Sequence, residues 1–362
     1  MADIRDFKCP SCGGAIHWDS TAQKMKCPFC ETEFDISTLQ SFDDDLRQDE
    51  KTDDMNWQSG PEAEWTEGET DNMRVYVCKS CGGEIIGDKD MGASSCPYCG
   101  NSVIVPSQFK GDLKPDILIP FKLNKEQAKD GLRRHMKGKR LLPKVFKDEN
   151  HIDEIKGIYV PFWLFDAQAE ADARYKAEQV NSWTDSKFRY TETRVYSVSR
   201  SGTLGFENVA CDGSSKLDDR LMDSIGPFNS AEAVPFQTAY LSGYLADRYD
   251  VTADQCRERA NERIRKSTAD TFVRTVTGYS SVRTENCSIR LSNARTKYAL
   301  YPVWLLNTTW RGNRYMFAMN GQTGRFIGDL PEDKGAYARW FALIGGIAAV
   351  AALGIQYLIY LV

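Results

Sequence analysis

The chain has 362 residues, of which 41% are hydrophobic and 27% are charged, and its formal net charge is −5. This length is enough for two or three compact units. The odd total of 11 cysteines does not suggest a disulfide framework, and the 18 acidic and 6 basic residues of segment 1–72 argue against nucleic-acid binding there. The first ten residues contain no apolar segment, so we expect no signal peptide.

Two cysteine quartets with the same spacing lie near the N-terminus. The first is Cys9, Cys12, Cys27 and Cys30, and the second is Cys78, Cys81, Cys96 and Cys99. Two CxxC pairs about 15 residues apart are typical of a zinc ribbon held by four thiolates. A CxxC pair can also be a redox motif, but matched pairs that occur twice favour metal binding. We therefore predict two structural zinc ions, one in each ribbon.

A zinc ion with four thiolate ligands has no open position, so we expect neither site to be catalytic. Each ribbon is too small to bury a useful core, and metal binding would supply its folding energy. His17 lies inside the first loop and is expected to be a bystander. Neither ribbon has a basic face, which favours protein binding or bracing over nucleic-acid binding.

Residues 41–72 connect the two ribbons and contain 12 acidic and 2 basic residues. This composition predicts a disordered acidic linker. Met55, Trp57 and Trp65 are exceptions within it, so short docking motifs are the alternative to a solvated tether.

The remainder of the chain before its last segment predicts an α+β body with an internal repeat. Asn124 and Thr252 each precede a helical pattern, and each has Gln three residues later, which predicts a capping box. Each helix is followed by a strand-like segment that contains Pro-x-Trp, around Trp163 and Trp304. Asn320-Gly-Gln-Thr-Gly is expected to be a hairpin turn rather than a phosphate-binding loop.

The body shows no recognisable catalytic motif, and we predict no catalytic residue, no small-molecule substrate and no enzyme activity. The histidines are His17, His135 and His151, and none lies in a triad or metal spacing. The single cysteines Cys211, Cys256 and Cys287 are expected to be structural. Lys129–Lys147 carries eight basic residues and one acid; a solvated helix face, lipid headgroups, the acidic linker or nucleic acid could each explain this stretch.

The last 23 residues, Trp340–Val362, contain one strongly polar side chain, Gln356. A helix of this length spans about 35 Å, which predicts a single transmembrane anchor, with a buried core helix as the alternative. Lys334 and Arg339 precede it and the thiols suit a reducing compartment, so we expect the N-terminal bulk in the cytoplasm. Ala342 and Gly346 form a small-xxx-small pair, which suits helix packing or simple contact with lipid.

The expected order of domains is thus as follows. Ribbon 1 covers 1–40, the acidic linker 41–72, ribbon 2 73–106, the α+β body 107–334 and the anchor 335–362. The two related modules of the body cover about 117–175 and 234–330.

Several segments, in order, resemble bacterial membrane proteins described as containing a TFIIB-type zinc ribbon. These are "CPSCGG…CPFC", "CKSCGGEI…CPYCG", "IPFKLNKEQA", "GIYVPFWLFDA", "AYLSGYLADRYDVTADQ", "YALYPVWLLNT" and "FAMNGQTGRFIGDLP". Such proteins are often labelled replication-restart helicases, but this chain has no GxxxxGK[ST] motif. Some are encoded beside phage-shock-type and flotillin-like (SPFH) membrane proteins, so the resemblance implies an adaptor that recruits such partners.

The sequence therefore favours a non-enzymatic zinc-ribbon adaptor or scaffold at the cytoplasmic membrane, with the membrane and proteins as partners and no nucleic acid. Two alternatives remain open at this stage. One is a membrane-tethered regulator that binds nucleic acid, and the other is an enzyme with a cleft in the α+β body.

Overall fold

The computed structural model describes residues 8–40, 53–57, 60, 63–66, 68–88, 95–101, 104–107, 113–143, 154–310 and 313–361. The chain forms two compact units, each built from several segments. Unit 1 comprises Met1–Ser59, Phe165–Val209 and Arg257–Arg295, and unit 2 comprises Gly60–Leu164, Ala210–Cys256 and Thr296–Val362. Three long strands, β8 (Lys156–Thr184), β9 (Arg189–Asp212) and β12 (Ser281–Trp310), continue from one unit into the other.

Unit 2 is built on a mixed sheet whose neighbouring strands run β10-β7-β12-β8-β11-β5-β4-β6. Its short strands are β4 (Met73–Cys78), β5 (Glu84–Asp88), β6 (Ile104–Ser107), β7 (Ile117–Leu118), β10 (Val234–Pro235) and β11 (Leu245–Asp247). β7 pairs in parallel with β12, and β11 pairs in parallel with β8. β13 (Asn313–Asn320) pairs antiparallel with β12, and β14 (Phe326–Gly328) pairs antiparallel with β13. The α+β class of the body is confirmed.

The hairpin turn predicted at Asn320–Gly324 joins β13 to β14. Gly324 has a φ of +80°, a conformation that glycine adopts at little cost. The Asn320 side chain closes the turn, because its Oδ1 accepts from the N–H groups of Gln322 and Thr323 at 2.9 Å each.

Helix α2 (Lys125–Met136) begins at the predicted capping box. The Gln127 N–H donates to Asn124 Oδ1, and the Asn124 N–H donates to Gln127 Oε1, each at 2.9 Å. Its apolar stripe follows the spacing of a helix that covers a sheet. The stripe residues Ala128, Leu132 and Met136 pack in one cluster with Trp304, Leu306, Phe317 and Met319 of the strands beneath.

Trp163 and Trp304, the tryptophans of the two Pro-x-Trp segments, make equivalent hydrogen bonds. Trp163 Nε1 donates to Val251 O at 2.8 Å, and Trp304 Nε1 donates to Leu123 O at 3.0 Å. Each acceptor lies directly before the capping residue of the other module's helix. The internal repeat stays a prediction, and this exchange of bonds supports it.

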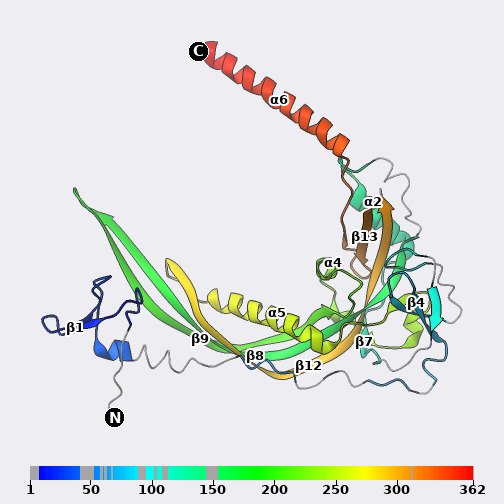
Figure 1. Cartoon of the computed structure of the whole chain (residues 1–362), viewed down its shortest axis with the longest axis horizontal. Coiled ribbons are helices and arrows are strands. Elements are labelled where there is room, and N and C mark those ends of the chain that lie inside the picture. Colours follow the sequence, from blue (N-terminus) through cyan, green and yellow to red (C-terminus); the bar gives the residue numbers. More distant parts are fainter. Residues whose placement is uncertain are drawn as a thin grey trace. The chain divides into compact units, whose positions relative to one another are not determined.

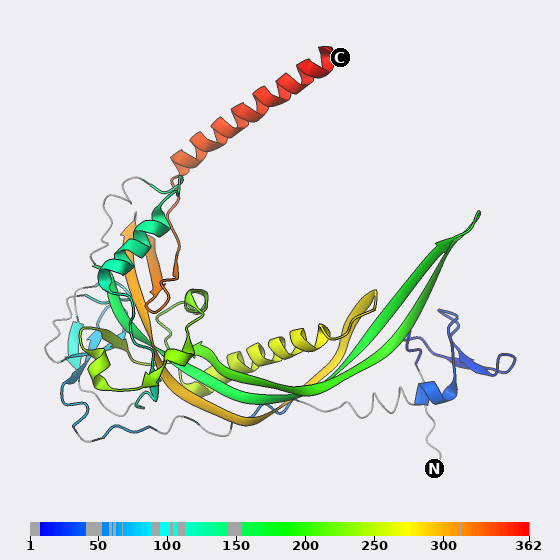
Figure 2. The same cartoon turned by 180° about the vertical axis from the view of Figure 1, so that it is seen from behind.

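In unit 1, α5 (Ala253–Val273) lies along the strands β8 and β12 (Figures 1 and 2). Residues 53–57 of the acidic segment pack here. Trp57 is only 9% exposed, and its Nε1 donates to Asn261 Oδ1 at 2.9 Å. Its ring lies 4.8 Å from that of Phe165 in an edge-to-face arrangement. Asp53 pairs with Arg265 at 2.9 Å.

Residues 41–72 were expected to form a solvated tether, and over residues 53–57 the packing differs from that expectation. It fits the alternative that Trp57 belongs to a short docking motif. The free energy gained by burying the Trp57 indole, with its N–H hydrogen-bonded, exceeds the cost of holding the acidic residues around it in place. Residues 41–52, 58–59, 61–62 and 67 of the expected linker lie outside the described residues.

The last helix, α6 (Lys334–Leu361), is the one helix among the described residues that is long and apolar enough to cross a membrane. The candidate span Lys334–Gln356 has a mean hydropathy of 1.8, and no residue of its most apolar 18-residue window is buried. The alternative of a buried core helix is therefore wrong within this structure.

Candidate metal centres

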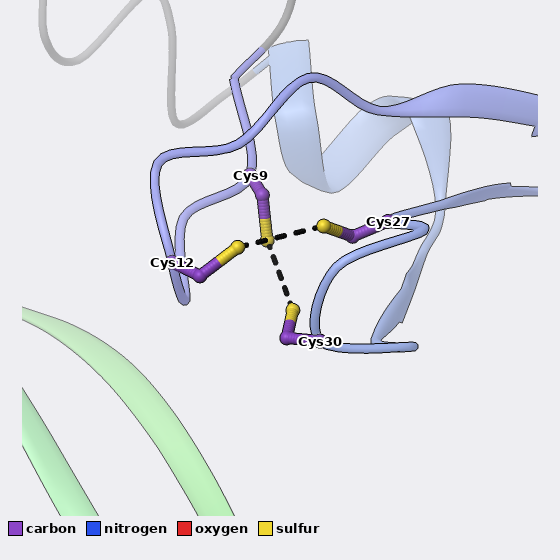
Figure 3. Close-up of side chains that lie close together, drawn as sticks. All are labelled: Cys9, Cys12, Cys27 and Cys30. Carbon is purple, nitrogen blue, oxygen red and sulfur yellow. Dashed lines mark hydrogen bonds between the residues drawn. The ribbon is translucent and has the colours of Figure 1, made fainter.

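The predicted quartets come together as two cages of sulfur atoms. In each cage the four Sγ atoms lie within 4.8 Å of one another. In the first, Cys9 and Cys30 are 3.5 Å apart, as are Cys12 and Cys27 (Figure 3). In the second, the corresponding distances are 3.6 Å. A tetrahedral ion with Zn–S bonds near 2.3 Å separates its sulfur ligands by about 3.8 Å, so both cages fit zinc closely.

The same backbone turns hold the ligands in both cages. The N–H of the first cysteine, Cys9 or Cys78, donates to the carbonyl of Gly14 or Gly83 at 2.8 and 2.9 Å respectively. The carbonyl of that first cysteine accepts from Gly13 or Gly82 at 2.8 Å. Gly13 and Gly82 have φ values of +73° and +69°, so the turn requires a glycine at the first position of each pair.

The thiols of the first cage have different proton affinities. Burial raises the pKa of Cys9 to about 12. The Thr32 hydroxyl and N–H lower the pKa of Cys30 to about 6. A metal ion binds thiolates, so it must displace the proton of Cys9 at neutral pH. Protons compete more strongly as pH falls, and metal binding is expected to weaken in the same direction.

Ribbon 1 forms a small sheet of its own. It consists of β1 (His17–Asp19), β2 (Lys24–Lys26) and β3 (Glu33–Phe34), paired in that order. Its buried cluster contains only Cys9, Ile16, Cys27 and Leu39, two of which are metal ligands. A hydrogen bond from Lys176 Nζ to Ser11 O at 2.9 Å joins it to β8. A metal ion held by the four thiols would therefore be the main source of order for this ribbon.

Ribbon 2 is part of the core of unit 2. β5 pairs with β11, and the ligands Cys78 and Cys96 belong to the same buried cluster as Ile158, Val160 and Leu245. Polar contacts add to this packing: Asn307 donates to Pro97 O, Lys156 to Ser95 O, and Arg248 pairs with Glu84. The residues that make these contacts with ribbon 2 lie far from it in the chain, and the ribbon 2 boundaries of 73–106 stay a prediction.

The second glycine of each pair makes room for an aromatic ring. A Cβ atom on Gly14 would lie 2.6 Å from Phe29, and one on Gly83 would lie 2.8 Å from Tyr98. Phe29 and Tyr98 occupy the same place in the two quartets, but Phe29 is 73% exposed and Tyr98 is 5% exposed. The two ribbons thus share a scaffold and differ in what covers it.

A buried acidic group at the base of ribbon 2 was not predicted. Asp247 lies beside Tyr98, and burial raises the pKa of Asp247 to about 7. The neighbouring depression of about 410 Å³ is lined largely by charged side chains that are already paired, including Arg248 with Glu84 and Lys216 with Asp250 at 3.8 Å. Only the pattern Asp247-Arg248-Tyr249-Asp250 hints at this network in the sequence.

The other candidate residues are not brought into a site. His17 is exposed on β1 and outside the cage. The ring of His135 lies 3.3 Å from Gly328 O and packs on Phe326, and burial lowers its pKa. Cys211, Cys256 and Cys287 belong to neither of the two metal-ligand groups found among the described residues. His151 lies outside the described residues.

We predict that the purified full chain binds two zinc ions. Cys27→Ser and Cys96→Ser should each reduce the zinc content to one ion, because three thiolates hold zinc far less tightly than four. Cys287→Ser is the matched control and should retain two. Elemental analysis of the purified proteins measures this, and a full zinc content in either quartet variant would contradict it.

The two second glycines offer a matched pair of substitutions. Gly83→Ala should lower the free energy of unfolding of unit 2 by about 1–3 kcal/mol, because the buried Tyr98 ring cannot move aside. Gly14→Ala should cost less than about 0.5 kcal/mol, because the exposed Phe29 ring can rotate away. Thermal unfolding of the zinc-bound proteins compares them, and equal losses would show that the two ribbons are packed alike.

Comparison with known proteins gives one curated relative. The chain is 32% identical over 344 residues to an uncharacterized protein, YdjG, of Bacillus subtilis (strain 168), and the match covers 95% of both chains. No family model matches the chain, and no solved structure matches it. A match of this identity and coverage shows that the chain belongs to the family of Bacillus subtilis YdjG.

Proposed function

We propose that this protein is a non-enzymatic adaptor anchored in the cytoplasmic membrane by α6, and that ribbon 1 is its protein-binding element. Ribbon 2 would brace the body rather than bind a partner. The observation that carries this proposal is the contrast between Phe29 and Tyr98, which have the same position in two otherwise matched ribbons but 73% and 5% exposure. Among the described residues Phe29 stays exposed, and this apolar surface is available to another protein.

The surface of ribbon 1 has the character of a protein-binding site. Trp18 is 47% exposed, whereas the matching position in ribbon 2 is Gly87. Phe29 and Ile36 are exposed on the same small ribbon. Exposed tryptophan and phenylalanine are typical anchors of protein interfaces.

The charges of ribbon 1 support a protein partner over nucleic acid. Lys26 pairs with Glu33 at 3.8 Å, and residues 8–40 carry four acidic residues and three lysines. Such a surface lacks the excess of cations needed to bind phosphates. By resemblance, phage-shock-type and SPFH membrane proteins are the partners that we propose.

The amino-acid composition of α6 and its flanks supports a membrane anchor and indicates its orientation. α6 is long and apolar enough to cross a bilayer, and Lys334 and Arg339 lie at its N-terminal end. Cations flank the cytoplasmic side of membrane spans. Eight thiols kept for metal binding also suit the reducing cytoplasm. We therefore propose a single-pass protein with its N-terminal bulk in the cytoplasm.

The test is partner capture in native membranes. A photo-crosslinking residue at Trp18 or Phe29 of the full chain should capture a specific protein, and Trp18→Ser combined with Phe29→Ser should reduce co-purification of that protein at least about tenfold. Trp183→Ser combined with Phe188→Ser removes two exposed aromatics elsewhere and should leave capture unchanged. Undiminished capture by the ribbon 1 variant would show that another surface recruits the partner.

A further inference from the structure

The end of α2 and the turn after it present a group of exposed cations. This basic cluster consists of Arg133, Arg134, Lys137, Lys139 and Arg140. The opposite face of α2 is buried against the sheet, so the helix is fixed with its cations outward. Lys144 and Lys147 of the predicted basic stretch lie outside the described residues.

The basic cluster lies against the first turns of α6, within unit 2. The guanidinium carbon of Arg140 lies 4.6 Å from the centre of the Trp340 ring, a cation–π contact. The Asp333 N–H donates to Leu141 O at 2.8 Å, which ties the turn to the start of α6. Asp333 Oδ1 in turn accepts from the N–H groups of Gly335 and Ala336 and caps the helix.

Acidic residues near the basic cluster neutralise only part of its charge. Asp130 pairs with Arg133 at 2.7 Å, and Asp333 lies 3.9 Å from Arg339. Glu126 pairs with Lys129 one turn earlier in α2, and Glu332 is exposed before α6. Lys334 and Arg339 add two more cations beside the five of the cluster, so the cations outnumber the acidic side chains among the described residues around the start of α6.

We propose that the basic cluster binds the headgroups of anionic phospholipids. The proposal rests on the membrane insertion of α6 in the proposed function and goes beyond it, because it assigns a lipid preference to named residues of the body. If α6 crosses the bilayer, its first turns lie at the headgroup level, where tryptophan is enriched. Arg140 touches the Trp340 ring, so the cluster meets the same layer, where cations attract anionic lipids.

Nucleic acid and the acidic linker fit the basic cluster less well. A bilayer at the start of α6 would leave little of this surface open to a duplex. In the described part of the linker, Asp53 is already paired with Arg265, and Asp54 is held through backbone bonds to Ile289 and Leu291.

The experiment uses the full chain in nanodiscs of phosphatidylcholine. Lipid brominated on its acyl chains is added either as phosphatidylglycerol or as phosphatidylcholine. Trp340 is the one tryptophan of α6, so quenching by these bromines reports on lipids around the start of the span, and Trp340→Phe gives the background. We expect brominated phosphatidylglycerol to be favoured about tenfold over brominated phosphatidylcholine at low salt, and less at high salt.

The variant combining Arg134→Gln, Lys137→Gln and Arg140→Gln should lose this preference. The matched control combines Lys187→Gln, Arg189→Gln and Lys266→Gln, three exposed cations of unit 1, and should keep it. Arg134→Lys with Arg140→Lys should also keep it. If the first variant loses zinc or helical content, the test depends on how the wild-type preference for phosphatidylglycerol changes with salt. The screening length in 0.5 M salt is about 4 Å, so an electrostatic preference should weaken there. A lipid preference that 0.5 M salt leaves unchanged overturns the proposal.

The remaining outcomes separate this proposal from the proposed function. Equal quenching by both brominated lipids shows that α6 is inserted and that the lipid preference is wrong. No quenching by either lipid contradicts membrane insertion and overturns both. A preference that survives in the cluster variant, or duplex DNA binding that needs the cluster without any lipid preference, overturns the proposal.

Discussion

The grouping of four cysteine thiols into a cage that could hold a metal ion is the feature on which the rest of this structure depends. A ribbon of about thirty residues cannot bury enough apolar surface to offset the entropy of its chain. Ribbon 1 illustrates this directly, since half of its four-residue core consists of ligand cysteines. In ribbon 2 the same cage lies at the edge of a large sheet, and its ligands Cys78 and Cys96 are packed into the main core of unit 2. The metal there would order both the ribbon and the neighbouring strands β5 and β11.

This difference explains why one chain carries two copies of the same element. The copy in unit 2 has its aromatic ring, Tyr98, buried beside Asp247 at the base of the ribbon. The other copy keeps Phe29 and Trp18 exposed. Under the proposed function, one scaffold would serve as a brace in unit 2 and as a recognition surface in ribbon 1. On that proposal, ribbon 1 and the proposed membrane span α6 lie on opposite sides of the body in the order of the sequence.

Local features of the fold could be predicted from the sequence. The cysteine spacing predicted which eight cysteines come together in the two cages. The capping residues Asn124 and Thr252 were recognisable because their hydrogen bonds join residues only three positions apart. The turn at Asn320 was predictable for the same reason. The burial of Trp57 was not, because its partners Phe165 and Asn261 lie more than 100 residues away in the chain. The pairing of β5 with β11, which makes ribbon 2 part of the core, is equally non-local.

Hydrogen–deuterium exchange of the zinc-bound full chain tests the central claim most directly, with Cys27→Ser and Cys96→Ser compared against the wild type. The account predicts that Cys27→Ser increases amide exchange within residues 8–40 and leaves unit 2 unchanged. Cys96→Ser should instead increase exchange in β4 and β5 and also in β11, which contains no ligand. If β11 stays protected after loss of Cys96, or if loss of Cys27 exposes the sheet of unit 2, the division of the two ribbons into a recognition element and a brace is contradicted.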